Sequence, residues 1–136
     1  MRWPSERRLV AAAAVVATVA TAGSLYFSLG MGLQPCELCW YQRILMYPLV
    51  VVLGVAALDD RLPHRTALPL AGPGIALAAY HSYLQATMTT CGLSGPCATV
   101  QFRLPTLGLT IPNLSLVAFL LVTGLVGAAW RTADRR

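Results

Sequence analysis

Residues 9–29 form an unbroken run of 21 residues without a charged side chain. Three further apolar stretches follow, at 44–58, 67–86 and 111–130, and the aromatic residues Trp40 and Tyr41 extend the second back to about residue 38. A helix needs about 20 apolar residues to cross the roughly 30 Å hydrocarbon core of a bilayer, and it satisfies its own backbone hydrogen bonds there. The sequence therefore predicts an all-α membrane protein, a bundle of four transmembrane helices at about 9–29, 38–58, 67–86 and 111–130.

The composition supports a chain that is largely surrounded by lipid. Charged residues make up 11% of the 136 residues, whereas soluble domains contain about a quarter. All basic residues are arginines that lie at the ends of the apolar stretches. They form no continuous basic stripe, so the net charge of +5 does not indicate binding to nucleic acid. No internal repeat or long linker is present, and we expect one integral membrane domain over 1–136, acting as a monomer in contact with membrane lipid.

The arginines predict how the bundle is oriented. Most of them would lie on one side of the membrane: Arg2, Arg7, Arg8, Arg61, Arg65, Arg131, Arg135 and Arg136. Only Arg43 and Arg103 would lie on the other side. Because positive charge is enriched in cytoplasmic segments, both termini are expected in the cytoplasm of a bacterium, with multiple passes through its cytoplasmic (inner) membrane. The outer loops, about 30–37 and 87–110, then carry all four cysteines into an oxidising compartment, where disulfides persist.

A different interpretation of the first apolar stretch is a cleaved signal peptide. The small residues at 20–22 resemble a cleavage site. The apolar run is longer, however, than the 7–15 residues that are typical of a signal-peptide core. The cysteines would lie outside the cytoplasm in either case.

The cysteines form two closely spaced pairs. Cys36 and Cys39 form a C-x-x-C before the second predicted helix, and five residues separate Cys91 from Cys97. A four-cysteine zinc site would repeat the first spacing in both halves, and haem attachment would need a histidine in place of Trp40, so neither group is predicted. Two inert structural disulfides are the simplest alternative. A disulfide within C-x-x-C closes a very small loop and stabilises a fold little, which favours a bond that is exchanged.

Arg43 lies four residues after Cys39, so the two share a face of the second predicted helix. A helix beginning near Pro35 would place Cys39 close to its N-terminus. Both the helix N-terminus and a nearby guanidinium favour the thiolate, which is the nucleophilic form of cysteine. The alternative is an arginine that extends to the lipid headgroups.

His81 and Gln85 form a second pair with the same spacing, near the outer end of the third predicted helix. Polar residues at this depth often only hydrogen-bond to a neighbouring helix. Their expected level in the membrane, close to that of Cys39 and Arg43, also makes them candidates for a functional site. The sequence leaves both interpretations open.

Four ordered motifs resemble the disulfide bond formation protein B (DsbB) family, and in particular its short members of the BdbC type. They are PCELCWYQR at 35–43, YHSYLQ at 80–85, CGLSGPC at 91–97 and LGLTIPNLSLVAF at 107–119. The resemblance covers nearly the whole chain. It implies a four-helix membrane enzyme, a protein dithiol:quinone oxidoreductase. Such an enzyme reoxidises an extracytoplasmic thioredoxin-fold thiol oxidase, a partner similar to DsbA or BdbD.

The resemblance also implies a role for each cysteine. Cys91 would be attacked by the thiolate of the partner to form a mixed disulfide, with Cys97 as its pair. Electrons would then pass to Cys36 and Cys39 and from there to a membrane quinone, either ubiquinone or menaquinone. This route is the established one of the family. The spacer between Cys91 and Cys97 is shorter than in the best-known members, which leaves the order of the disulfide intermediates open.

For the quinone site, the resemblance implies that Cys39 faces the ring and that Arg43 supports its thiolate. His81 would lie near the same ring, with Gln85 beside it. A protein similar to vitamin K epoxide reductase is an alternative enzyme, although in that family the C-x-x-C follows the loop cysteines. A membrane scaffold whose disulfides only order its loops is the alternative without catalysis.

Overall fold

The computed structural model describes residues 4–33, 37–87 and 105–136, and four long helices make up most of these residues. Helix α1 spans Pro4–Leu25 and continues into a π-helical turn, η1, at Tyr26–Gly30. Helix α2 spans Glu37–Leu58, α3 spans His64–Thr87 and α4 spans Ile111–Asp134. The prediction of an all-α protein is confirmed for this part of the chain.

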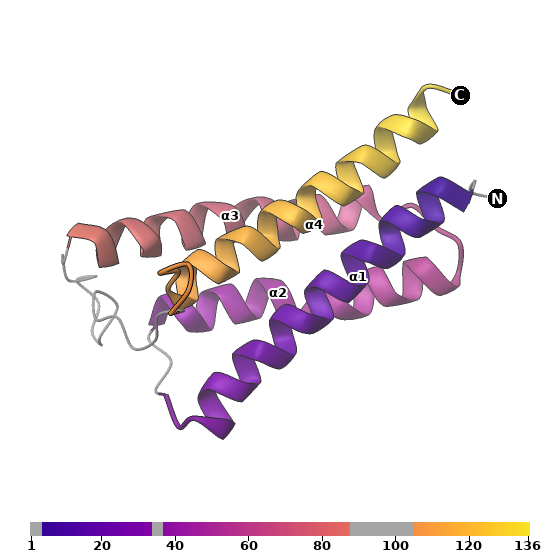
Figure 1. Cartoon of the computed structure of the whole chain (residues 1–136). Helices are drawn as coiled ribbons and strands as arrows, with labels where there is room; N and C mark the ends of the chain where they lie inside the picture. Colours follow the sequence, from indigo (N-terminus) through magenta and orange to yellow (C-terminus); the bar gives the residue numbers. More distant parts are fainter. Residues whose placement is uncertain (1–3, 34–36, 88–104) are drawn as a thin grey trace.

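The helices lie side by side in an antiparallel bundle (Figure 1). Helices α1 and α3 each pack against both α2 and α4, while α2 and α4 barely touch across the bundle. The start of α1, the end of α4 and the turn between α2 and α3 lie at one end (Figure 1). The end of η1, the start of α2, the end of α3 and the start of α4 lie at the other end, which we call the loop end.

The core combines small side chains from α1 and α3 with larger ones from α2 and α4. Fully buried alanines line the inner faces of α1 and α3: Ala13, Ala17, Ala67, Ala71 and Ala78. Leu49 and Leu53 of α2 and Phe119 and Val122 of α4 are also fully buried. Small residues allow helices to approach closely in a membrane, where van der Waals packing rather than hydrophobic burial drives their association.

Three helical segments are long and apolar enough to cross a membrane: Pro4–Gly30, Glu37–Leu58 and Ile111–Asp134. Helix α3 has 24 residues, which span about 36 Å and are sufficient in length. Its content of proline, glycine and histidine lowers its hydropathy, and it includes Pro69 and Pro73 within the helix. The fourth transmembrane span therefore stays a prediction, although α3 packs within the same bundle.

The helices extend beyond the predicted apolar stretches. Helix α1 begins at Pro4 rather than near residue 9, and α4 continues to Asp134 rather than ending near residue 130. The added turns contain charged residues such as Arg7 and Arg131. Apolar runs mark the part of a helix that lies in hydrocarbon, whereas the backbone hydrogen bonds of a helix can continue into the headgroup region. Helix α1 packs against α2 and α4 in the bundle.

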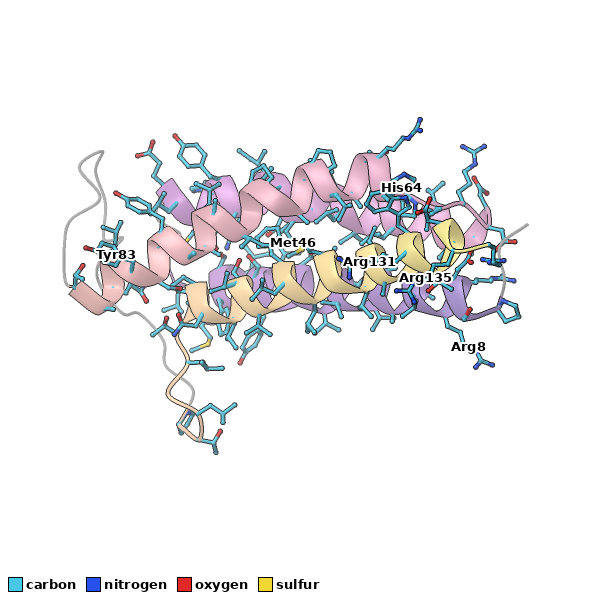
Figure 2. The ribbon with its side chains drawn as sticks, turned by 90° about the horizontal axis from the view of Figure 1, so that it is seen from above. Arg8, Met46, His64, Tyr83, Arg131 and Arg135 are labelled. Atoms are coloured by element: carbon cyan, nitrogen blue, oxygen red, sulfur yellow. The ribbon has the colours of Figure 1, made fainter. Side chains whose placement is uncertain are left out.

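The end of the bundle opposite the loop end carries most of the described arginines. Every described arginine except Arg43 lies there, and Figure 2 labels Arg8, Arg131 and Arg135 at the same end of the bundle as His64. The His64 ring stacks on Trp130, with ring centroids 5.2 Å apart, and so joins α3 to α4. Arg136 forms an ion pair with the buried carboxylate of Glu6. This distribution is the one expected for a cytoplasmic end, and the membrane side itself stays a prediction.

Gly74 of α3 permits the close approach of α4. A Cβ atom at this position would overlap the buried ring of Phe119, whereas a Cβ at Gly72 would have no atom within 4 Å. We therefore expect Gly74→Ala to destabilise the bundle by about 1–3 kcal/mol, the usual cost of overpacking a core. Gly72→Ala is the matched control and should be neutral or slightly stabilising. Thermal unfolding of both variants in detergent tests this expectation, and equal unfolding temperatures would contradict the packing described for α3 and α4.

Candidate functional site at the loop end of α2

Three neighbouring side chains at the start of α2 form the centre of the site. Cys39 is half-buried, Gln42 is buried and Arg43 is half-buried. Their spacing of three and four residues places them on one face of the helix. The shared face predicted for Cys39 and Arg43 is confirmed, because both residues line the same cavity. Cys39 also packs near Leu84 of α3.

This cavity has a volume of about 490 Å³ and lies between α1, α2 and α4. Met46 contributes to its wall and lies in the middle of the bundle in Figure 2. Most of the lining is aliphatic. The polar members of the lining are few and come from α1, η1, α2 and α4: Ser24, Ser28, Gln42, Arg43, Tyr47 and Ser115. Cys39 and Met46 of α2 contribute sulfur atoms. Ligand pockets in proteins commonly have this size and this combination of an apolar wall with a few polar groups.

The side chain of Arg43 crosses from α2 to α1. Its Nε donates a hydrogen bond to Ser24 Oγ at 3.0 Å. Its Nη2 donates to the Ser24 carbonyl oxygen at 3.1 Å and to Ser28 Oγ. The guanidinium carbon also lies 5.2 Å from the centre of the Trp40 ring, within the range of a cation–π contact. Arg43 is therefore held by specific contacts inside the bundle. An arginine that only extends to the lipid headgroups would not need these contacts.

His81 forms a buried contact with α2. Its Nδ1 atom lies 3.0 Å from Nε2 of Gln42, and both side chains are buried. When the amide donates this hydrogen bond, the imidazole is neutral and carries its proton on Nε2. Of the two residues, only Gln42 lines the cavity. The structure thus shows the helix–helix contact that was one interpretation of His81, and a direct role near a quinone ring stays a prediction.

The remaining predicted site residues are placed as follows. Gln85 is half-buried near the end of α3 and does not line the cavity. Cys36, Cys91 and Cys97 lie outside the described residues. The structure therefore places Cys39 and Arg43 on the same cavity, and His81 contacts the cavity residue Gln42. The predicted place of Gln85 beside the quinone ring stays a prediction.

Several polar residues of the cavity were not predicted from the sequence: Ser24, Ser28, Gln42, Tyr47 and Ser115. The serines Ser24 and Ser28 interrupt an apolar stretch with the i, i+4 spacing of one helix face, and this spacing was an available signal. Gln42 follows Cys39 by three residues and could have been found in the same way. No sequence signal indicates that the face of α1 with the serines meets Arg43, because that contact depends on the packing of α1 against α2.

An apolar cavity bordered by a cysteine and a fixed arginine, within a helical membrane bundle, is the arrangement of a membrane-embedded thiol site. The family model described as disulfide bond formation protein DsbB matches residues 6–129. The chain therefore belongs to the DsbB family, and it is an integral membrane protein of the disulfide-forming thiol oxidoreductases. The resemblance inferred from the four motifs is confirmed.

Individual relatives agree with this assignment. Disulfide bond formation protein C of Bacillus subtilis is 44% identical over 119 residues, which cover 79% of this chain and 82% of the relative. A probable disulfide formation protein of Oceanobacillus iheyensis is 41% identical over 117 residues, 79% of each chain. A protein with the same description from Coxiella burnetii is 36% identical over 130 residues, 90% of this chain and 87% of the relative. No solved structure matches the chain.

Proposed function

We propose that this protein is a protein dithiol:quinone oxidoreductase that reoxidises an extracytoplasmic thioredoxin-fold partner. The observation that carries the proposal is the cavity that Cys39 and Arg43 share near the loop end of the bundle. A cysteine against an apolar cavity allows a thiol to react with a lipid-soluble oxidant. An arginine at the same wall provides a fixed positive charge and hydrogen-bond donors.

The residues of the cavity fit a quinone headgroup. The aliphatic wall matches an apolar ring and an isoprenoid chain, and polar groups of α2 and α4 could hydrogen-bond the ring carbonyls. Gln42 and Arg43 offer donors from α2, and Ser115 offers a hydroxyl from α4. A bound ubiquinone or menaquinone would accept two electrons and two protons as the Cys36–Cys39 dithiol becomes a disulfide.

Arg43 would support the reactive form of Cys39. A bare thiolate is disfavoured where the dielectric is low, and the positive charge of a guanidinium one helical turn away offsets this cost. The contacts with Ser24 and Ser28 keep that charge in place. Cys39 and Arg43 therefore act together, the first as the thiolate and the second as its counter-charge.

Cys91 and Cys97 would connect this site to the partner. A thiolate of the reduced partner attacks Cys91 of the Cys91–Cys97 disulfide, and Cys97 leaves as a thiolate. The second thiol of the partner then resolves the mixed disulfide, which leaves the partner oxidised and both loop cysteines reduced. Exchange with the Cys36–Cys39 disulfide restores the loop pair and passes the two electrons to the cysteines beside the cavity.

The proposal is tested with the purified chain in detergent, a reduced thioredoxin-fold thiol oxidase and a short-chain ubiquinone or menaquinone. We expect continuous oxidation of the partner only when a quinone is added. A scaffold with inert disulfides would leave the partner reduced under all these conditions, and that result would reject the enzyme assignment.

The proposed location gives a separate prediction about membrane sidedness. After reduction of intact bacterial cells, a membrane-impermeant thiol reagent should label Cys91 or Cys97 from outside. A cysteine introduced at Arg135, at the opposite basic end of the bundle, is the matched control and should be labelled only after the cells are opened. The reverse pattern would place the loop cysteines in the cytoplasm and remove the extracytoplasmic partner from the proposal.

A further inference from the structure

The contacts of Arg43 with Ser24 and Ser28 use the Nε and Nη2 atoms of its guanidinium and leave Nη1 outside these contacts. A guanidinium has five N–H donors. The single donor on Nε and the two on Nη2 match three acceptors, which are Ser24 Oγ and the Ser24 carbonyl of α1 and Ser28 Oγ of η1. Within the part of the chain that the structure describes, Nη1 has no hydrogen-bond partner. Arg43 also lines the cavity.

From these contacts we infer that Ser24 and Ser28 are positioning residues, which hold Nε and Nη2 of Arg43 against α1 and reserve Nη1 as the donor to a quinone carbonyl oxygen. The inference rests on the proposed function, because it assigns a quinone to the cavity. It adds a role for α1, which carries none of the cysteines or other predicted site residues. The ligand class recognised by Nη1 is a planar ring with a carbonyl acceptor.

The backbone of α1 changes at the place where it receives Arg43. The α-helical register ends at Leu25, one residue after Ser24, and the π-helical turn η1 begins at Tyr26. The N–H of Met31 bonds to the carbonyl of Tyr26, five residues earlier. Such π turns are rare in helices and are frequent at functional sites. Ser28 lies within this turn, so the wider backbone sets the position of its hydroxyl relative to Ser24.

A second side chain of α2, that of Tyr47, also forms a hydrogen bond with Ser24. The hydroxyl of Tyr47 donates to Ser24 Oγ at 3.4 Å, and Tyr47 also lines the cavity. Ser24 Oγ therefore receives hydrogen bonds from two residues that are one helical turn apart on α2. This arrangement restrains the Ser24 rotamer and, through it, the plane of the guanidinium. A lysine could not reproduce it, because an ammonium group lacks the planar fork of donors.

The test measures quinone binding rather than turnover. Isothermal titration of the purified chain with a short-chain ubiquinone, without any partner dithiol, gives the dissociation constant directly. We expect the double variant Ser24→Ala and Ser28→Ala to bind about tenfold more weakly, since two hydrogen bonds to a charged group are lost. Ser28→Ala alone should show a smaller loss, and Ser28→Thr, which keeps the hydroxyl, should restore binding.

Thr18→Ala is the matched control on the same helix. Thr18 is exposed, its hydroxyl bonds only to the carbonyl of Ala14, and it does not line the cavity. This variant removes a hydroxyl from α1 without touching Arg43, so it should bind quinone like the wild type. Unfolding temperatures measured without quinone show whether each variant still folds. If the double variant does not fold, binding is compared in the two single serine variants instead.

A double-mutant cycle with Arg43→Lys separates positioning from cavity shape. If the serines act through the guanidinium, removing both in the Arg43→Lys background should change the dissociation constant less than twofold. An equal loss in both backgrounds, or wild-type binding in the serine variants, would overturn the inference while the proposed site stood. Wild-type binding in Arg43→Met would instead overturn the assignment of the quinone to this cavity.

Discussion

Replacing Cys39 with serine is expected to stop quinone reduction almost completely. The serine hydroxyl is close in size to the thiol, but it is not ionised near neutral pH and cannot form a disulfide with Cys36. No other cysteine of the described residues lies on the cavity. We expect turnover to fall to the rate of the uncatalysed reaction, which is measured as the loss of quinone absorbance with a reduced partner.

The same variant should keep the first half of the reaction. Cys91 and Cys97 remain, so the variant should still form a mixed disulfide with the partner, detectable by non-reducing electrophoresis. Tyr41→Phe is the matched control on α2. Tyr41 is exposed, bonds to Glu37 at 2.7 Å and does not line the cavity. Steady turnover in Cys39→Ser would show that another residue is next to the quinone.

Arg43 variants should give the second largest effect. Arg43→Met removes the charge beside Cys39 and the donors that face the cavity. Hydrogen bonds to charged groups contribute about 1.5–3 kcal/mol, so quinone use should fall by about 10- to 100-fold. Arg43→Lys should retain partial activity, because it keeps the charge but cannot bond Ser24 and Ser28 with the same planar geometry. Turnover measured against quinone concentration distinguishes weaker binding from slower chemistry.

Arg61→Met is the matched control for the loss of an arginine. Arg61 lies in the turn between α2 and α3, at the end of the bundle away from the cavity. Its removal should leave quinone kinetics unchanged. Wild-type kinetics in Arg43→Met as well would contradict the assignment of the quinone to the cavity that Arg43 lines.

The fold was largely predictable because lipid imposes a strong constraint on sequence. The apolar stretch 9–29 and the stretch at 111–130 could hardly adopt another structure. The first lies within α1 and the π-helical turn η1, and the second lies within α4. The third stretch was harder to assess. Its helix is present as α3, but Pro69 and Pro73 and the glycines beside them make it less apolar than the other three. The apolar content of this stretch therefore predicts that it is helical, but it does not determine whether the helix crosses the membrane.

The site was predictable where its residues share one helix. The i, i+4 spacing placed Cys39 and Arg43 on one face of α2, and both line the cavity. The partners of these residues could not be predicted, because Ser24 of α1 and His81 of α3 meet α2 only through the packing of the bundle. Gln42 illustrates the same limit, since its contact with His81 joins positions 39 residues apart in the chain.

In the proposed reaction, electrons pass from a partner dithiol through this chain to a quinone. The most direct measurement is an anaerobic reaction of the purified protein with a reduced thioredoxin-fold partner and a short-chain quinone, in which quinol and partner disulfide are quantified together. We expect one quinol for each disulfide formed, and no quinol with the Cys39→Ser variant. Partner oxidation without quinol, or quinol formation that continues in Cys39→Ser, would contradict it.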